Sequence, residues 1–146
     1  MSPQPTRSAK PSAVVVDIDG TLAIITDRNP YSHHGVLKDK PNAPVIEVAR
    51  ALASAGHTLV IVSGRSELAR EDTERWLARH LGVPFEGPYM RAADDDRKDA
   101  VIKKEIYTKQ IKPTYDVLCV LDDRDQVVHM WRAMGLTCLQ VAPGAF

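Results

Sequence analysis

Two carboxylates stand one residue apart in the segment Asp17-Ile18-Asp19-Gly20-Thr21, directly after an apolar run at 13–16. The chain turns as it leaves an extended strand, so both side chains can face one site and perform different tasks. Clustered carboxylates repel each other, and oxygen ligands with waters suit Mg²⁺, which would neutralise them. Asp-Gly is also a common turn pair, so this segment alone indicates a plain turn rather than a site.

Two other predicted strands also end in polar side chains. Ser63-Gly64-Arg65 follows the β-branched run at 58–62, and Asp122-Asp123-Arg124 follows the run at 117–121. Ligands of an open parallel sheet bind beyond the carboxyl ends of its strands. If the three strands are parallel, these groups converge on one cleft edge although they are distant in sequence. Three such strand ends in one chain favour a functional site over a turn.

Apolar runs alternate with helical patterns along the chain, and this alternation positions the polar groups. The predicted strands are 13–16, 58–62, 84–90, 117–121 and 136–141. The predicted helices are 43–55, 66–81, 97–111 and 127–134. Strands that alternate with helices imply parallel pairing and right-handed crossovers. The sequence therefore predicts an α/β three-layer sandwich with a central parallel sheet.

The length of 146 residues predicts one domain. Residues 1–12, which hold three prolines, are interpreted as a flexible tail or linker, and 13–146 as the domain. Residues 22–42 show no sustained period and contain Asn29-Pro30, Gly35 and Pro41, so they predict an irregular excursion.

Charge and cysteine content exclude several classes of protein. The 19 basic and 19 acidic residues cancel, which argues against nucleic-acid or membrane binding driven by bulk charge. The two cysteines form no framework, so a reducing cytoplasm is expected. No apolar run approaches the ~18 residues of a membrane span, so no membrane partner is expected.

The polar segments together resemble a known superfamily. The Asp-x-Asp-Gly-Thr at 17–21, Ser63, Lys103 and Asp122-Asp123 are similar to the four motifs of the haloacid-dehalogenase-like phosphohydrolases. Most of 14–146, and above all the residues around 122–142, resembles the phosphatase half of phage polynucleotide kinase/3′-phosphatases. The resemblance implies a Rossmann-like haloacid-dehalogenase fold without a large cap domain, and Mg²⁺-dependent removal of 3′-phosphate from polynucleotide ends.

The resemblance also implies catalytic roles. Asp17 would be the nucleophile that forms an aspartyl-phosphate, and Asp19 the general acid and then the general base. Ser63 and Lys103 would bind phosphate oxygens. From the sequence alone, Lys103 would be read as a solvated lysine on a helix surface. Lys98 and Lys104 are alternative candidates for its role.

Metal and substrate ligands follow from the same resemblance. Mg²⁺ would be held by Asp17, by the backbone carbonyl of Asp19, and by Asp122 or Asp123. Asp99 is expected to orient Lys103 or an arginine. The substrate-binding residues implied by the resemblance are Arg28, Arg65, Arg91 and Asp99.

The spacing of the motifs bears on the substrate. About forty residues separate Asp19 from Ser63, and Ser63 from Lys103, so neither interval has room for a lid domain. An uncovered site admits the end of a polymer, although residues 22–42 could form a small flap that carries Arg28. The alternatives are a phosphatase of mononucleotides or other small molecules, a phosphoacceptor receiver and a non-catalytic assembly domain. The order of the motifs disfavours the receiver.

The expected partners are 3′-phosphate ends of RNA or DNA. The resemblance leaves open a homo-oligomer and a kinase domain in a longer or separate chain. The sequence contains no GxxxxGK[ST] motif, so we expect no 5′-kinase activity from these residues.

Overall fold

The computed structural model describes residues 10–25, 29 and 34–146. Its centre is a five-stranded sheet in the order β5-β4-β1-β6-β7, and all neighbouring strands are parallel. The strands are β1 (Ser12–Val16), β4 (Thr58–Ser66), β5 (Glu86–Arg91), β6 (Asp116–Asp122) and β7 (Cys138–Gln140). The predicted strand at 84–90 is confirmed as β5, at one edge of the sheet.

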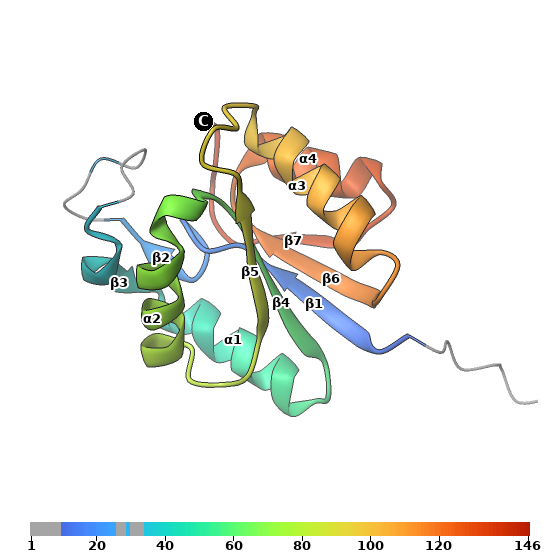
Figure 1. Cartoon of the computed structure of the whole chain (residues 1–146). Helices are drawn as coiled ribbons and strands as arrows, with labels where there is room; N and C mark the ends of the chain where they lie inside the picture. The colour runs from blue at the N-terminus through green and yellow to red at the C-terminus, as the bar shows by residue number, and fades with distance from the viewer. Residues whose placement is uncertain (1–9, 26–28, 30–33) are drawn as a thin grey trace, which may run out of the picture.

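Four helices cover the two faces of the sheet (Figure 1). They are α1 (Ala43–Ser54), α2 (Arg70–His80), α3 (Asp99–Ile106) and α4 (Asp125–Ala133). A 3-10 turn (Glu67–Ala69) precedes α2, and a π-helical turn (Tyr107–Ile111) continues α3. The predicted three-layer α/β sandwich is therefore confirmed, and the helix predicted from 97 begins two residues later.

Alternate residues of β1 enter the two halves of the core. Val14 and Val16 pack in one cluster with residues of α1 and α2, such as Ile46 and Trp76. Val15 packs in the other cluster with residues of α3 and α4. Because both faces are covered, the strand is a continuous apolar run, as expected of a parallel sheet between helices.

The first long connection, at 22–42, is more regular than its sequence suggests. Its ends form an antiparallel pair of two-residue strands, β2 (Ala23–Ile24) and β3 (Lys40–Pro41), with a 3-10 turn at Val36–Lys38. The pair forms because the segment leaves and returns at adjacent places, which local sequence cannot reveal. Residues 26–28 and 30–33 of this connection lie outside the described part.

The strand β4 also differs from the prediction. It continues through Ser63, Gly64 and Arg65 to Ser66, where Ser66 pairs with Arg91 of β5. The sequence places the strand end at Val62 because Ser-Gly is a turn signal, whereas pairing with the neighbouring strand carries the extended backbone four residues further.

The amino-terminal tail predicted at 1–12 lies mostly outside the described residues. Lys10 and Pro11 contact the loop before β6, where Lys10 Nζ donates to the Lys112 carbonyl and the Asp116 N–H donates to the Pro11 carbonyl, each at 3.0 Å. None of the helices in the described ranges has the length and apolar character needed to cross a lipid bilayer.

Candidate active site

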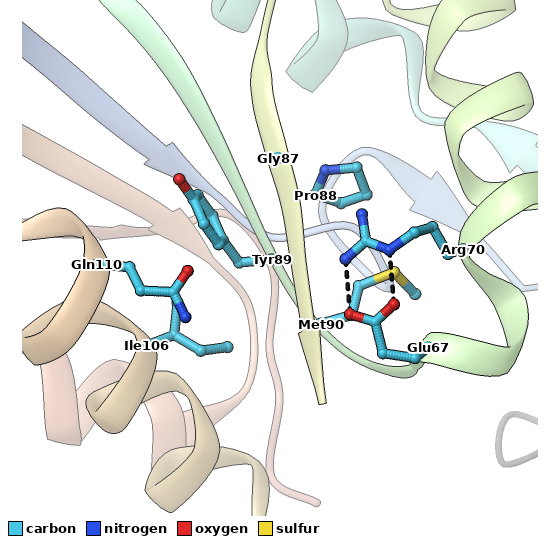
Figure 2. Close-up of a pocket in the computed structure, with 8 residues that line it drawn as sticks. All are labelled: Glu67, Arg70, Gly87, Pro88, Tyr89, Met90, Ile106 and Gln110. Atoms are coloured by element: carbon cyan, nitrogen blue, oxygen red, sulfur yellow. Dashed lines mark hydrogen bonds and ion pairs between the residues drawn. The ribbon is translucent and has the colours of Figure 1, made fainter. Parts of the chain in front are cut away.

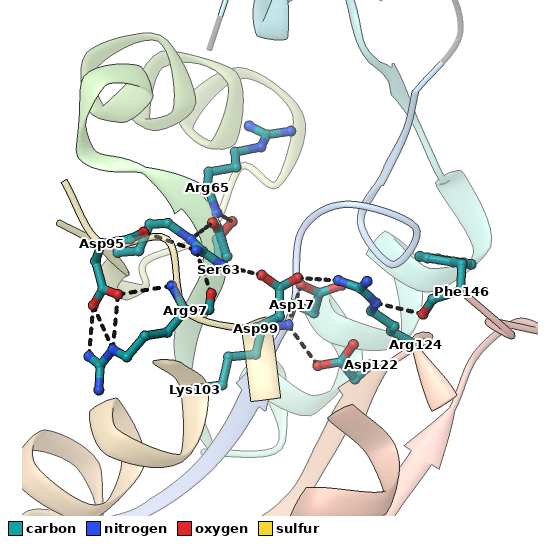
Figure 3. A network of polar contacts seen from close by, with 12 residues as sticks. Asp17, Ser63, Arg65, Asp95, Arg97, Asp99, Lys103, Asp122, Arg124 and Phe146 are labelled. Carbon is teal, nitrogen blue, oxygen red and sulfur yellow. Dashed lines mark hydrogen bonds and ion pairs between the residues drawn. The ribbon is translucent and has the colours of Figure 1, made fainter. Parts of the chain in front are cut away.

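The carboxyl ends of β1 and β6 bring three buried carboxylates together. Asp17, Asp122 and Asp123 each offer an oxygen within 4.8 Å of the others. The two strands are paired up to this point, and the Asp17 N–H donates to the Leu121 carbonyl at 3.0 Å. The convergence expected from parallel pairing is therefore present for these two strand ends (Figure 3).

Lys103 of α3 lies between two of the three carboxylates. Its Nζ donates to Asp17 Oδ1 at 2.8 Å and to Asp122 Oδ2 at 2.9 Å, and its side chain is 3% exposed. The alternative lysines, Lys98 and Lys104, are both exposed. The structure thus selects Lys103 as the lysine that reaches the acidic cluster, a choice that helix periodicity alone left open.

The cluster carries more negative than positive charge. Burial, with the charges of Asp122 and Asp123, raises the pKa of Asp17 well above its usual value, even though Lys103 opposes the shift. Burial also raises the pKa of Asp123. Burial alone would lower the pKa of Lys103, but Asp122 and Asp17 outweigh it, so its pKa rises and the ammonium stays charged.

These properties fit a divalent cation. The cluster has three carboxylates, and its one lysine bonds to two of them. Every candidate ligand atom is an oxygen, and the side chains are buried at the carboxyl ends of the strands. Hard cations such as Mg²⁺ prefer such oxygen donors, and the positive charge would offset the burial and the mutual repulsion that raise the pKa values of Asp17 and Asp123.

Further hydrogen bonds fix the orientation of the carboxylates. The Thr21 hydroxyl donates to Asp17 Oδ2 at 2.9 Å. Asp122 accepts the Asp123 N–H at 2.9 Å and the indole N–H of Trp131 at 3.2 Å. Trp131 is fully buried, and its contact with Asp122 had no sequence signal beyond the helical spacing.

The second carboxylate of the first motif has a different partner. Two nitrogens of Arg65 donate hydrogen bonds to Asp19, Nε to Oδ2 at 3.0 Å and Nη2 to Oδ1 at 2.7 Å. The same guanidinium donates to Asp39 at 2.9 Å and to Thr73 at 3.1 Å. The neighbouring Ser63 is buried, and its Oγ accepts the Arg65 N–H at 3.1 Å.

Asp39 and Thr73 are residues of this network that the sequence analysis missed. Asp39 is buried in the connection before β3, and Thr73 is buried in α2. Both residues lie in other elements than Arg65. Neither belongs to a sequence motif, so nothing in the sequence marks either of them as a partner of Arg65. Only the packing of α2 and the connection 34–41 against the end of β4 reveals them.

A second group of charges surrounds Asp99, at the start of α3. Asp99 contacts Arg91 and accepts from Arg124 Nη1 at 2.8 Å (Figure 3). Asp99 was expected to orient Lys103 or an arginine. In the structure it contacts Arg91 and Arg124, and its orienting role stays a prediction. Arg91 also donates to the carbonyls of Gly64, Asp95 and Arg97 at 2.7, 3.0 and 2.7 Å.

Arg124 was absent from the predicted site residues. The available signal was its place directly after Asp122-Asp123, which brings it to the same strand end. Arg28, the remaining predicted substrate ligand, lies outside the described residues. Its contact with substrate, like the roles assigned to the other predicted site residues, stays a prediction.

A cavity of about 300 Å³ lies elsewhere, beside the edge strand β5 (Figure 2). It is lined by Glu67, Arg70, Ile106, Gln110 and residues 87–90. Glu67 and Arg70 pair with each other across one side, at 2.6 Å. None of the acidic cluster lines this cavity, so the chemistry-bearing residues lie at the carboxyl ends of β1 and β6 rather than in this hollow.

Comparisons with known proteins match this chain to proteins described as polynucleotide kinases. Residues 11–146 match the family model described as the polynucleotide kinase PNKP phosphatase domain. Over 124 residues, 84% of the chain, it is 33% identical to a protein of Autographa californica nuclear polyhedrosis virus named "Putative bifunctional polynucleotide kinase/RNA ligase". The matched region is 18% of that viral protein.

Solved structures agree with the family match. A chain in the Pnkp1/Rnl/Hen1 RNA repair complex superposes with a TM-score of 0.90 and 40% identity, covering 99% of this chain and 46% of that one. The chain thus spans less than half of that relative and about a fifth of the viral one.

A more distant structure shares the fold alone. The class C acid phosphatase of Bacillus anthracis superposes with a TM-score of 0.60 at 17% identity, over 95% of this chain and 69% of that one. This likeness shows that the fold is shared, and the family itself is shown by the match over residues 11–146. The chain belongs to the polynucleotide kinase PNKP phosphatase-domain family of haloacid-dehalogenase-like phosphatases.

Proposed function

We propose that this chain is a Mg²⁺-dependent phosphomonoesterase that removes the 3′-phosphate from polynucleotide ends. The observation that carries the proposal is the buried cluster of Asp17, Lys103, Asp122 and Asp123 at the carboxyl ends of β1 and β6. Family membership supports the polynucleotide substrate, because the matched model describes the phosphatase domain of a polynucleotide kinase.

Asp17 is the proposed nucleophile. One oxygen is held by Thr21 and the other by Lys103, so the carboxylate is fixed before substrate arrives. Its attack forms an oxygen–phosphorus bond and breaks the bond to the ribose 3′ oxygen, giving an aspartyl-phosphate. This divides one difficult displacement into two easier ones.

Asp19 is the proposed acid and base. It gives a proton to the departing ribose oxygen, which would otherwise leave as an unstable alkoxide. It then takes a proton from the water that attacks phosphorus, which releases inorganic phosphate and restores Asp17. The two-point contact with Arg65 holds the Asp19 carboxylate in one orientation.

Ser63 and Lys103 are proposed to bind the equatorial phosphate oxygens. Both are buried next to the strand ends, and a preorganised ammonium is worth more in a water-poor site than in solution. Arg28, Arg65, Arg91 and Asp99 are proposed to contact or orient the substrate. In the structure Arg65 and Arg91 also hold protein groups, so they position the site as well.

The proposed metal ligands are Asp17, Asp122, Asp123 and the backbone carbonyl of Asp19. When bound there, Mg²⁺ supplies positive charge to the phosphate oxygens as negative charge shifts toward the leaving group. Asp122 already accepts three hydrogen bonds, from Lys103, Trp131 and the Asp123 N–H, which hold its carboxylate toward Asp17.

The short intervals between the motifs support a polymeric substrate. The two intervals between the motif residues, each of about forty residues, contain α1 and α2 of the core and so have no room for a separate lid. We propose that the domain, residues 13–146, acts beside a 5′-kinase, in the same or a separate chain, during nucleic-acid end repair. The similarity to a chain of an RNA repair complex supports this context.

The test is a substrate panel with and without Mg²⁺. A 3′-phosphorylated oligonucleotide is compared with a nucleoside 3′-monophosphate, and released phosphate is measured. We expect Mg²⁺-dependent release and higher kcat/KM for the oligonucleotide. Equal or faster turnover of the mononucleotide would refute the preference for polymer ends.

A matched pair of variants tests the nucleophile. Asp17→Asn should abolish phosphate release because an amide cannot attack phosphorus. Asp116→Asn changes an exposed aspartate at the opposite end of β6 and should retain full activity. Surviving activity in Asp17→Asn would remove Asp17 from the proposed role.

A further inference from the structure

The segment 141–146 is fixed across the strand end that carries the acidic pair. The Val141 N–H donates to the Asp122 carbonyl at 3.0 Å, and the Asp125 N–H donates to the Gly144 carbonyl at 2.8 Å. Gly144 packs so closely that a Cβ there would lie 2.0 Å from the Asp123 carbonyl oxygen. The last residues of the sequence are therefore held against the site.

This segment places an exposed aromatic ring beside a site cation. Arg124 Nε donates to the Phe146 carbonyl at 2.7 Å, and the guanidinium carbon lies 5.4 Å from the centroid of the Phe146 ring. The other side of the same guanidinium is held by Asp99. Phe146 is nevertheless 63% exposed, the largest exposed fraction among the large apolar residues of the described chain.

The ring lies beside the residue that follows the acidic pair. Arg124 directly follows Asp122 and Asp123, and in Figure 3 Arg124 lies between Asp17 and Phe146. If a polynucleotide with its terminal phosphate at Asp17 leaves the site along Arg124, its last base meets the exposed ring of Phe146.

Building on the proposed function, we infer that Phe146, held by Arg124, is a stacking platform for the base of the 3′-terminal nucleotide. Unpaired bases stack on aromatic side chains whatever their identity, because every base has a π-face, and a neighbouring arginine adds a cation–π contribution. The platform recognises a nucleoside rather than a bare sugar phosphate. It also gives affinity without a basic surface, consistent with the zero net charge.

The kinetic test compares two oligonucleotides that differ only in the base of the terminal nucleotide. One ends in a normal 3′-phosphorylated nucleotide and the other in an abasic 3′-phosphorylated residue. Stacking is worth ~1–3 kcal/mol per base, so Phe146→Ala should lower the ratio of their kcat/KM values about 5- to 150-fold. Phe146→Trp should keep the ratio, because it restores an aromatic face.

The control is Leu118→Ala, which truncates another exposed apolar residue near the amino end of β6 and should leave both substrates unaffected. The bond from Arg124 goes to the backbone of Phe146, so the side-chain variants keep it. An unchanged ratio in Phe146→Ala, or an equal loss on both substrates, would overturn the platform.

A binding experiment separates this inference from the proposed function. An oligonucleotide with 2-aminopurine as its 3′-phosphorylated terminal base is titrated with protein in EDTA, where no turnover is needed. Stacking should quench its fluorescence with wild type and Leu118→Ala but not with Phe146→Ala. Quenching by wild type without later phosphate release in Mg²⁺ would keep the platform and refute the phosphatase. Phosphate release without quenching would refute the platform and keep the phosphatase.

Discussion

Replacing Gly20 with alanine would place a methyl group where the Asp123 carboxylate now lies. A Cβ at this position would be 2.0 Å from Asp123 Oδ2 and 2.6 Å from Cγ. Gly20 also has φ +82°, a left-handed conformation that costs other residues ~1–2 kcal/mol. The carboxylate can swing aside, so the contact itself should cost little stability, but Asp123 must then move by about 1 Å.

A displacement of this size has a larger effect on activity than on stability. Misplacement of a catalytic group by ~1 Å can lower the rate about 10²-fold. We therefore expect Gly20→Ala to lose ~1–2 kcal/mol in the free energy of unfolding and about 10²-fold in kcat/KM. Urea denaturation followed by circular dichroism measures the first, and phosphate release from the 3′-phosphorylated oligonucleotide measures the second.

Gly135→Ala is the matched control. Gly135 has φ +85°, and a Cβ there meets nothing within 4 Å. It should lose the same ~1–2 kcal/mol while keeping its activity. If Gly20→Ala is as active as Gly135→Ala at a temperature where both are folded, the position of Asp123 does not matter for catalysis, and the assignment of the cluster is wrong.

Three further predictions concern the buried charges and thiols. Lys103→Met leaves buried carboxylates without their cation and should lower the free energy of unfolding in urea by ~3–5 kcal/mol. Lys104 is exposed, so Lys104→Met should change this free energy by no more than about 0.5 kcal/mol. Equal losses in the two variants would contradict the buried contact. Mg²⁺ should raise the melting temperature of wild type but raise that of Asp123→Asn less, and an equal rise in both would place the ion elsewhere. Burial, with the charge of Asp122, raises the pKa of Cys138 to about 11, so at pH 8 only on the order of 10⁻³ of this thiol is ionised. Burial also raises the pKa of Cys119. Both thiols should react with a disulfide reagent far more slowly in native than in urea-unfolded protein, and reaction of the native thiols at the unfolded rate would show that they are accessible.

Much of the fold follows from the sequence because its strands are buried on both faces. The runs at 13–16 and 117–121 are continuous and apolar, which is the pattern of parallel strands between two helical layers. The boundaries were less predictable. β4 extends to Ser66 because it pairs with β5, and the pair β2–β3 forms because two distant ends meet.

Some residues of the candidate site could be predicted from the sequence and others could not. The acidic motifs at 17–19 and 122–123 are contiguous in sequence, so residue type and spacing mark them as candidate site residues. Lys103 is different, because several lysines occur on its helix and only packing decides which one is buried between carboxylates. Asp39 lies far in sequence from Arg65, its partner, and had no signal at all.

The sequence by itself determined the alternation of strands and helices, the acidic strand ends and, through its motifs, the resemblance to a phosphatase superfamily. These properties are local, since they depend on residue type and spacing along the chain. Tertiary structure alone decided that Lys103 bridges Asp17 and Asp122, that Arg65 holds Asp19, and that Arg124 holds Phe146 beside the site. Contacts of this kind depend on how separate elements pack, and no short-range pattern encodes the distance between side chains as far apart along the chain as Asp17 and Lys103.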